Sequence, residues 1–557
     1  MKILLTAINA KYIHSNPAIY SLKASAGEAG KSVELAEFTI NHRTEEILRD
    51  LYRRKPDVLL FSCYIWNIVY VRELAAEWAK LMPEVPVWLG GPEVSFGAEK
   101  LLEEMGAVTG ILCGEGEESF RRLSEAYVRG CADEECFRQI PGLVWRKKDG
   151  GQIISNPSAE PLDMNSLPFL YEGTAAFENR IIYYESGRGC PFSCSYCLSS
   201  IDKSIRFRSP EKVCRELQFF LDERVPQVKF VDRTFNCRKS HAMAIWTYLL
   251  EHDNGVTNFH FEIAADLLDD DELNLIRRMR PGLIQLEIGV QSVNPKTLAA
   301  IRRSMDLERL ARTVERVREG HNVHQHLDLI AGLPYEDYES FGRSFDAVFA
   351  MKPDQLQLGF LKVLKGSRMH KEAGKYGIVY RDEPPYEVLF TPWLPFSDVL
   401  RLKMIEEMVE IYYNSHQFRK SLTWLLTRWP SPFVFFEELA QFYEERGEEQ
   451  RKHSRAQRYG LLLEFAKERF PDEEDRIRTL LTIDYYLRER AKARPDFAPD
   501  QKAYQEKIRG ILKKTGKQVH AEGMTDESGQ EIYLIFDYER RDPLTGDARL
   551  IRWEDET

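Results

Sequence analysis

The first 130 residues repeat one pattern five times: a short, mostly apolar run is followed by a segment with apolar residues at helical spacing. The apolar runs occupy 3–8, 33–40, 57–64, 86–90 and 108–113, and the helical segments occupy 17–29, 44–54, 67–82, 98–105 and 117–129. Apolar runs of this kind are typical of strands that are covered on both faces. Their alternation with helices predicts a doubly wound parallel sheet of the α/β class, which binds ligands on the loops beyond the carboxyl ends of its strands.

A second series of six strand–helix units is predicted within 181–364. Its strands are expected at 181–186, 227–232, 258–264, 283–290, 323–330 and 355–363, and its helices near 210–224, 240–252, 270–279, 295–303, 306–319 and 336–350. Six such units predict an open or partial (βα)6 barrel, whose chemistry lies at the C-terminal ends of the strands. Between the two series, 131–180 contains a predicted hairpin that turns at 147–151, and we interpret this stretch as a connector lying against the next domain.

The pattern changes again after about residue 370, where aromatic-rich helical segments dominate and no catalytic motif is found. A final β-hairpin is predicted over 531–553, with its turn at 543–546. We therefore expect an α/β domain at 1–135, a connector at 136–175, a barrel core at 176–370 and a mostly helical extension at 371–557 that covers the mouth of the barrel. A chain of 557 residues is long enough for such a multidomain arrangement.

Charge and hydropathy narrow the range of partners. The chain has 77 basic and 88 acidic residues and a formal net charge of −11, which argues against binding to bulk nucleic acid or to an anionic membrane. No apolar run reaches the roughly 18–20 residues that a membrane helix needs, and residues 1–8 are too short for a secretion signal. These features predict a cytoplasmic protein with no membrane partner.

Three of the nine cysteines, Cys190, Cys194 and Cys197, lie within eight residues, directly after the first strand of the second series. Three thiolates on one loop can wrap a single inorganic centre. Zinc is the weaker candidate, because structural zinc takes four ligands and no second cysteine pair follows at a suitable distance. A disulfide would leave one thiol over and is disfavoured in the cytoplasm. A 4Fe–4S cluster ordinarily takes four thiolates, so three would leave one iron open to a small chelating ligand.

The Cys-x3-Cys-x2-Cys spacing, with Tyr196 just before the third cysteine, resembles the signature of the radical S-adenosylmethionine (SAM) superfamily. The resemblance implies that Cys190, Cys194 and Cys197 hold a 4Fe–4S cluster whose open iron is chelated by the amino and carboxylate groups of SAM. It also implies that one electron from the cluster cleaves SAM into methionine and a 5′-deoxyadenosyl radical, which abstracts hydrogen. Tyr196 is included among the expected SAM contacts.

Polar residues on the later strands resemble the coproporphyrinogen-oxidase-like and methylthiotransferase-like branch of this superfamily. By this resemblance the amino, carboxylate and ribose groups of SAM are contacted by Glu262, Gln291, Ser292, Arg303 and Asp328. A zwitterion with a ribose diol requires such a set: one cation for its carboxylate, carboxylates for its ammonium and hydroxyls, and an amide that serves either.

Two further polar groups lie in the predicted barrel. His324, His326 and Asp328 alternate along one strand and therefore share a face. A second metal site there is left open, although a polar lining of the barrel interior is the favoured interpretation. Asp232 ends the second strand of the series at the same mouth and is a candidate contact for SAM or substrate.

A doubly wound domain ahead of this barrel resembles the Rossmann-like cobalamin-binding domain of the cobalamin-dependent radical SAM class. Its expected cobalamin contacts lie on loops that follow strands: Asn9, Tyr12, Ser62, Tyr64, Asn67, Gly90, Gly91, Pro92, Gly114, Glu115 and Gly116. The glycines permit tight turns and a close approach of the backbone to a flat ligand. A dinucleotide is disfavoured, because the acidic loop would repel a pyrophosphate and no Gly-x-Gly-x-x-Gly follows the first strand.

The loop after the first strand departs from the pattern of cobalamin domains that use a histidine as the lower axial ligand. Those domains carry Asp-x-His-x-x-Gly, whereas this chain has Asn9-Ala10-Lys11-Tyr12-Ile13-His14. His14 is thus on the corresponding loop but at a different spacing. We therefore expect cobalamin bound base-off and without a histidine ligand, a state that favours transfer of a methyl radical to carbon.

The resemblance implies a methyltransferase that uses one SAM to form methylcobalamin and a second SAM to generate the substrate radical. A non-methylating enzyme on the same scaffold, performing ring contraction, cyclisation or another rearrangement, is the first alternative. A cobalamin or iron–sulfur sensor without turnover is the second. Expected partners are an electron donor such as flavodoxin or ferredoxin and an unidentified peptide, lipid-like or small-molecule substrate.

Overall fold

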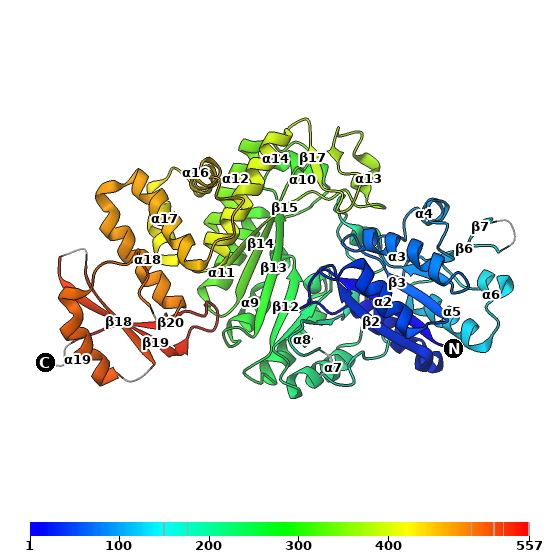
Figure 1. The fold of residues 1–557 in the computed structure, drawn as a ribbon. Coiled ribbons are helices and arrows are strands. Elements are labelled where there is room, and N and C mark those ends of the chain that lie inside the picture. The colour runs from blue at the N-terminus through cyan, green and yellow to red at the C-terminus, as the bar shows by residue number, and fades with distance from the viewer. Residues whose placement is uncertain (149–150, 175–176, 492, 516–517, 527–528, 555–557) are drawn as a thin grey trace. The chain divides into compact units, whose positions relative to one another are not determined.

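The computed structural model describes residues 1–148, 151–174, 177–491, 493–515, 518–526 and 529–554 (Figure 1). The chain forms two compact units. Unit 1 comprises Met1–Arg278, Leu298–Asp306 and Phe360–Pro392, and unit 2 comprises Met279–Thr297, Leu307–Gly359 and Trp393–Thr557.

The N-terminal part of unit 1 is built on a seven-stranded sheet with the order β2-β1-β3-β4-β5-β6-β7. The first five strands are parallel and the last two antiparallel, with the bounds β1 (Ile3–Asn9), β2 (Val33–Thr39), β3 (Val58–Ser62), β4 (Val87–Gly90), β5 (Gly110–Leu112), β6 (Leu143–Arg146) and β7 (Ile153–Ser155). The predicted doubly wound sheet is thus confirmed. The hairpin β6–β7 extends the sheet at the edge of β5; residues 149–150 of its expected turn lie outside the described residues.

Helices cover both faces of this sheet, because alternate residues of its strands point to opposite sides. Leu4 and Ile8 of β1 join one apolar core, which also contains Trp78, whereas Ile3 and Leu5 join a second core around Trp88. The helices are α1 (Pro17–Ser25), α2 (Thr44–Arg54), α3 (Ile68–Leu81), α4 (Ala98–Glu104), α5 (Glu117–Arg129) and α6 (Glu134–Arg138), with a 3-10 helix at Gly27–Ser32. These helices hold the loops that follow the carboxyl ends of the strands.

The rest of unit 1 begins a second parallel sheet, with β8 (Ile182–Tyr184), β11 (Gln227–Phe230) and β12 (Asn258–Ile263) paired in that order. A short antiparallel pair, β9 (Gly187–Arg188) and β10 (Arg206–Phe207), brackets the cysteine loop. The remaining elements are α7 (Pro210–Asp222), α8 (Lys239–Glu251), α9 (Asp270–Arg277), α13 (Arg368–Glu372), β16 (Val379–Tyr380), β17 (Val388–Phe390) and 3-10 helices at Leu198–Ser200, Phe235–Cys237 and Ala265–Leu267.

Unit 2 contains three more of the predicted barrel strands, β13 (Ile284–Gln291), β14 (His324–Ala331) and β15 (Gln355–Phe360), in the sheet order β15-β14-β13. β13 and β14 are parallel, as expected from the strand–helix alternation. The helices between these strands are α10 (Pro295–Ala300), which begins in this unit, α11 (Leu307–Glu319) and α12 (Tyr338–Ala350). All six strands of the second series therefore form near their predicted positions.

The C-terminal part of unit 2 is mainly helical, as predicted. Its helices are α14 (Phe396–Met408), which continues as a π-helix at Val409–Asn414, α15 (Arg419–Leu425), α16 (Pro432–Glu445), α17 (Arg455–Arg469), α18 (Glu474–Arg488) and α19 (Gln505–Thr515). The predicted terminal hairpin forms as β19 (Glu531–Arg541) and β20 (Ala548–Arg552), and β18 (Val519–Thr525) adds a third antiparallel strand that was not predicted. None of the described helices has the length and apolar composition that a membrane crossing requires.

Candidate functional site

The three clustered cysteines lie on one loop of unit 1, between β9 and β10. Cys190 and Cys194 are 7% and 6% exposed, and Cys197 is half-buried. The loop is fixed from two sides, because the Ser195 amide donates to the carbonyl of Ile301 at 2.8 Å and the Ser195 carbonyl accepts from the Met369 amide at 2.7 Å. These two backbone hydrogen bonds fix the position of the loop and of its thiol groups.

The surroundings of these cysteines suit a negatively charged sulfur centre. Arg303 donates through Nη1 to Sγ of Cys194 at 3.6 Å, and Thr234 Oγ1 lies 3.6 Å from Sγ of Cys190. Burial acts to lower the pKa of Arg303, but the neighbouring Tyr196 and Cys194 outweigh it and the pKa is raised. A fixed cation beside sulfur favours the thiolate form that iron requires. The donor set therefore fits an iron–sulfur cluster.

A fourth cysteine, Cys237, also lies near this loop, which the sequence did not reveal. Burial, with a smaller contribution from Cys190, raises the pKa of the Cys237 thiol to about 11. At neutral pH its side chain is therefore a neutral thiol, and it lies outside the three-cysteine motif.

Asp232 is buried in the fold and does not face an open site. It is 3% exposed, and its carboxylate accepts hydrogen bonds from the amide of Ser186 at 2.9 Å and from the Ser186 hydroxyl at 2.6 Å. Nε2 of His241 lies 3.0 Å from the same hydroxyl. Burial raises the pKa of Asp232 to about 7 and lowers that of His241 to about 4. This buried chain fixes the end of β8 just before the cysteine loop.

The other expected SAM contacts are distributed over both units. In unit 1, Glu262 is half-buried on β12 and Arg303 contacts the cysteine loop. In unit 2, Ser292 is fully buried, and its hydroxyl donates to Glu336 at 2.7 Å, whose pKa burial raises to about 7. Ser292 is therefore engaged in supporting the loop after β13.

Gln291 shows two signs of a ligand contact. It ends β13 with a φ of 73°, a left-handed conformation that costs a non-glycine residue energy and that clusters at functional sites. Its Oε1 atom is buried and accepts no hydrogen bond from any of the described residues. A buried acceptor of this kind calls for a donor from outside the protein, as the ammonium or hydroxyl groups of SAM would supply.

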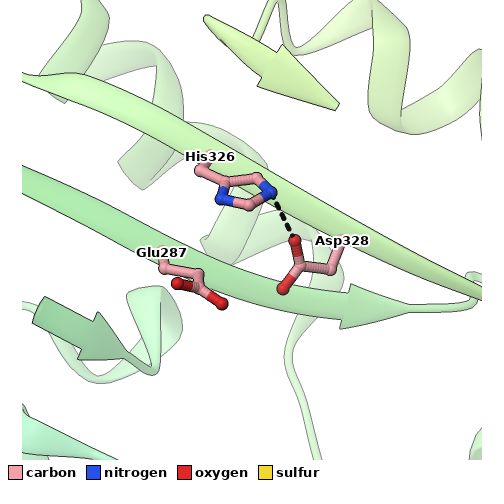
Figure 2. Close-up of side chains that lie close together, drawn as sticks. All are labelled: Glu287, His326 and Asp328. Atoms are coloured by element: carbon pink, nitrogen blue, oxygen red, sulfur yellow. Dashed lines mark ion pairs between the residues drawn. The ribbon is translucent and has the colours of Figure 1, made fainter. Parts of the chain in front are cut away.

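Three ionisable side chains meet on one face of β13 and β14, as Figure 2 shows. Glu287 is the register partner of His326, and Asp328 lies two residues further along on the same face. Nε2 of His326 is 2.9 Å from a carboxylate oxygen of Asp328, and the potential ligand atoms of all three residues lie within 4.8 Å of one another. The predicted sharing of a face by His326 and Asp328 is confirmed, and Glu287 joins them through strand pairing that no sequence spacing reveals.

A cavity of about 1060 Å³ opens in unit 1 at the carboxyl end of the first sheet. Roughly 300–1,000 Å³ is usual for small-molecule sites, so this cavity suits a large ligand. Of the expected cobalamin contacts, its lining includes Asn9, Ser62, Tyr64, Gly90, Gly91, Pro92, Gly114, Glu115 and Gly116. Its lining also includes Tyr196, Cys197, Leu198 and Ser199 from the cysteine loop. One cavity thus borders both candidate cofactor sites.

Two of the expected cobalamin contacts lie elsewhere. Tyr12 is 60% exposed and lies under the guanidinium of Arg180, and Asn67 is fully buried, with its amide donating to the carbonyls of Ile8 and Ser62. Neither lines the cavity. Trp66, by contrast, does line it and stacks on Tyr64 with ring centroids 4.4 Å apart. Its place between the expected contacts Tyr64 and Asn67 was the available signal in the sequence, since an aromatic side chain on a ligand-binding loop offers a large contact surface.

The glycines of the loop after β4 are required by the backbone. Gly91 has a φ of 112°, and a Cβ there would lie 2.5 Å from the carbonyl oxygen of Cys63. This close approach draws the loops after β3 and β4 together and leaves room above them for a ligand, as expected for a glycine-lined cradle.

The acidic loop after β5 serves mainly to join the two parts of unit 1. Glu115 pairs with Arg206 at 2.7 Å, and Glu117 pairs with Arg188 at 2.5 Å. Arg188 and Arg206 flank the cysteine loop on β9 and β10. These arginines, which sequence reasoning did not select, tie the edge of the cavity to the cysteine loop.

His14 lines the cavity, but its ring is engaged. Nδ1 of His14 lies 2.5 Å from the hydroxyl oxygen of Tyr183, and residue 14 forms a backbone bridge with Ile181. Burial, followed by the charges of Lys11 and Lys229, lowers the pKa of His14. The contact engages one of the two ring nitrogens and ties the loop after β1 to β8.

Three parts of the chain match models of protein families. Residues 3–124 match the B12 binding domain, 184–348 match the radical SAM superfamily, and 374–538 match a family described as a protein of unknown function, DUF4080. The first two matches cover the loops and strands from which the sequence-predicted cofactor sites were drawn.

Individual relatives are distant. The chain is similar to the cobalamin-dependent radical SAM methyltransferase TokK of Streptomyces tokunonensis, with 26% identity over 63% of this chain and 54% of TokK. It is also similar to the anaerobic magnesium-protoporphyrin IX monomethyl ester cyclase of Rubrivivax gelatinosus, with 23% identity over 60% of this chain and 61% of the cyclase. The chain thus spans little more than half the length of these relatives.

Among solved structures, the cobalamin-dependent SAM radical enzyme OxsB with aqua-cobalamin bound has a similar fold. Its TM-score is 0.59, with 12% identity over 92% of this chain and 81% of OxsB. The likeness extends the shared fold beyond the two cofactor domains.

Proposed function

We propose that this cobalamin-dependent radical SAM protein transfers a methyl group from SAM to an unactivated carbon of its substrate, with cobalamin as the methyl carrier. The observation that carries the proposal is the single cavity of about 1060 Å³ that is lined both by the glycine loops of the first sheet and by residues of the cysteine loop. A methyl carrier and a radical source must act on one substrate, so they must border a common space.

In this proposal Cys190, Cys194 and Cys197 hold the cluster, and Arg303 stabilises the negative charge on their sulfur atoms. Once bound, the cluster, SAM and cobalamin supply the electron transfer and group transfer that protein side chains lack. The protein holds SAM by its charged and polar groups, for which we propose Glu262, Gln291, Ser292, Arg303 and Asp328, together with Tyr196. Gln291 has the clearest support, because its strained backbone and its buried acceptor both point to a ligand.

The cobalamin site would be formed by the loops after β1, β3, β4 and β5. The stacked pair of Tyr64 and Trp66 offers a flat surface for the corrin ring, and the glycine backbones permit close approach. Because the loop after β1 has Asn9-Ala10-Lys11-Tyr12-Ile13-His14 in place of Asp-x-His-x-x-Gly, we propose that cobalamin binds base-off and without a histidine ligand.

The electron for SAM cleavage would come from a cytoplasmic donor such as flavodoxin or ferredoxin. The substrate class stays open among peptides, lipid-like molecules and small metabolites, and the net charge of −11 argues against bulk nucleic acid. The extension after residue 370 is proposed to shape the substrate site.

A non-methylating reaction is the second candidate, favoured by the similarity to the magnesium-protoporphyrin IX monomethyl ester cyclase. The test uses the full chain, reconstituted without oxygen with iron, sulfide and cobalamin, and supplied with SAM and a reductant. We expect both S-adenosylhomocysteine, from methyl donation, and 5′-deoxyadenosine, from reductive cleavage, measured by mass spectrometry. Formation of 5′-deoxyadenosine alone would contradict methylation and favour the rearrangement, whereas no SAM turnover at all would favour a sensor.

A further inference from the structure

Glu93 is a buried carboxylate on the rim of the cavity. It follows Pro92 on the loop after β4, is 5% exposed and lines the cavity together with Phe96. A carboxylate in such a place is stable only when charged or hydrogen-bonding partners compensate for its lost hydration. The partners of Glu93 therefore determine how this loop is held.

Among the described residues, Glu93 has two side-chain partners, and they come from a segment more than 270 residues later in the chain. Nζ of Lys365 lies 3.3 Å from Oε1 of Glu93, and the hydroxyl of Tyr386 donates to the same oxygen. The ammonium of Lys365 also lies 4.8 Å from the centre of the Tyr386 ring. Lys365 follows the part matched to the radical SAM superfamily, and Tyr386 lies inside the part matched to the family of unknown function.

The segment holds Tyr386 in one conformation. Its side chain is 2% exposed, its φ is 56°, and its carbonyl accepts a hydrogen bond from the Val363 amide at 2.9 Å. A left-handed backbone is unfavourable at a bulky residue and persists only where the surroundings enforce it. The strain is maintained here at the point where Tyr386 contacts the cavity loop.

The same two segments also touch through Gly366. This residue has a φ of 84°, and a Cβ there would lie 2.4 Å from the ring of Phe96. Leu364 and Lys365, just before it, line the cavity directly. The contact between the segment and the loop is thus close along several residues.

We propose that Tyr386 and Lys365 act as positioning residues for cobalamin, and that the beginning of the region of unknown function is therefore part of the cobalamin site. They hold Glu93, and with it the loop at 90–96, in the shape that receives the cofactor. This inference rests on the proposed function only in taking cobalamin as the ligand of the cavity.

The test compares Tyr386→Phe and Lys365→Met with the full-length wild type in absorbance titrations with hydroxocobalamin. Tyr386→Phe removes the hydroxyl that donates to Glu93, and Lys365→Met removes the ammonium that contacts Glu93 and borders the cavity. Supporting partners of a cofactor site are typically worth about 10–100-fold in affinity, so we expect each variant to bind cobalamin at least about 10-fold more weakly. Tyr380→Phe is the matched control and should bind as the wild type does, because Tyr380 lies in the same segment but neither lines the cavity nor hydrogen-bonds to Glu93.

Two further measurements separate positioning from general damage. The iron content after reconstitution is expected to stay at the wild-type level. Lys365→Met leaves the buried Glu93 without its cation, so its melting temperature is expected to fall, and cobalamin is therefore titrated well below the melting temperature of each variant. The double variant should bind little worse than either single variant, because the hydroxyl of Tyr386 and the ammonium of Lys365 hold the same oxygen of Glu93. Wild-type affinity in both variants would overturn this inference while leaving the proposed function intact. If the wild type itself bound no cobalamin, the proposed function and this inference would both fall.

Discussion

Replacing Cys194 by alanine is expected to abolish SAM cleavage. Cys194 is buried on the cysteine loop and is the sulfur that receives the hydrogen bond from Arg303. Loss of a supporting partner around a metal site costs about 10–100-fold, so the loss of a direct ligand should lower the yield of 5′-deoxyadenosine by more than about 100-fold. Mass spectrometry of SAM products, together with iron and sulfide analysis of the reconstituted protein, measures the effect.

Cys237→Ala is the matched control. Cys237 lies near Cys190, but its thiol has a raised pKa of about 11 and is outside the three-cysteine motif. We expect it to leave iron content and SAM cleavage at the wild-type level. Full cleavage by Cys194→Ala, or equal losses in both variants, would contradict the assignment of the cluster to Cys190, Cys194 and Cys197.

Replacing Arg188 by methionine is expected to destabilise unit 1 strongly. The Arg188 and Glu117 side chains are only 16% and 8% exposed, and their charged atoms lie 2.5 Å apart. Removing one partner of a buried ion pair leaves the other charge uncompensated, at a cost of about 3–5 kcal/mol. For a domain of this size, a loss of that order corresponds to a fall in melting temperature of about 10 °C, which calorimetry of the reconstituted protein measures.

The pH dependence of this effect has a defined sign. Burial acts to raise the pKa of Glu117, but Arg188 outweighs it and the pKa is lowered, so the pair stabilises the wild type above the unfolded pKa of a glutamate. That contribution is lost as the pH falls through the lowered folded pKa. In Arg188→Met the buried Glu117 is destabilising at neutral pH, and the deficit should shrink as acid protonates it.

Arg121→Met is the matched control for Arg188. Arg121 pairs with Glu118 and Glu125 along the exposed face of α5, where its own side chain is 36% exposed. Surface pairs contribute about 0–1 kcal/mol, so this variant should melt close to the wild type. A similar fall in melting temperature in both variants would show that the buried Glu117–Arg188 pair stabilises the protein no more than a surface pair does.

Much of the fold followed from local sequence patterns. The helices at 44–54 and 117–129 were predicted with the bounds that the structure shows for α2 and α5, because their apolar periodicity is strong and Gly130 terminates the second one with a φ of 72°. β18 was missed because its sequence, Val519–Thr525, mixes a buried Glu522 with a Gly523 that packs under Tyr504. Only tertiary contacts make such a segment a strand.

In the candidate site, too, local sequence patterns predicted some residues, whereas others are revealed only by tertiary contacts. The three cysteines were predicted because their Cys-x3-Cys-x2-Cys spacing is local in the sequence and is typical of a cluster-binding loop. The partners of Glu93 and Glu117 were not found, because Tyr386 and Arg188 meet them through folding and no local pattern records the pairing. Asn67 was predicted to contact cobalamin from its place in a suitable loop, whereas its amide is used by the backbone of that loop. Sequence position identifies the loop, but hydrogen bonding decides which way a side chain points.

In the proposed function, cobalamin and the cluster border one cavity in unit 1. The most direct measurement is electron paramagnetic resonance of the full chain loaded with both cofactors, with cobalamin in its cobalt(II) form and the cluster reduced. We predict that each signal is split or broadened by the other, relative to samples that hold one cofactor alone. A spectrum equal to the sum of the two single-cofactor spectra, or a cysteine loop that binds zinc and no iron, would contradict the account.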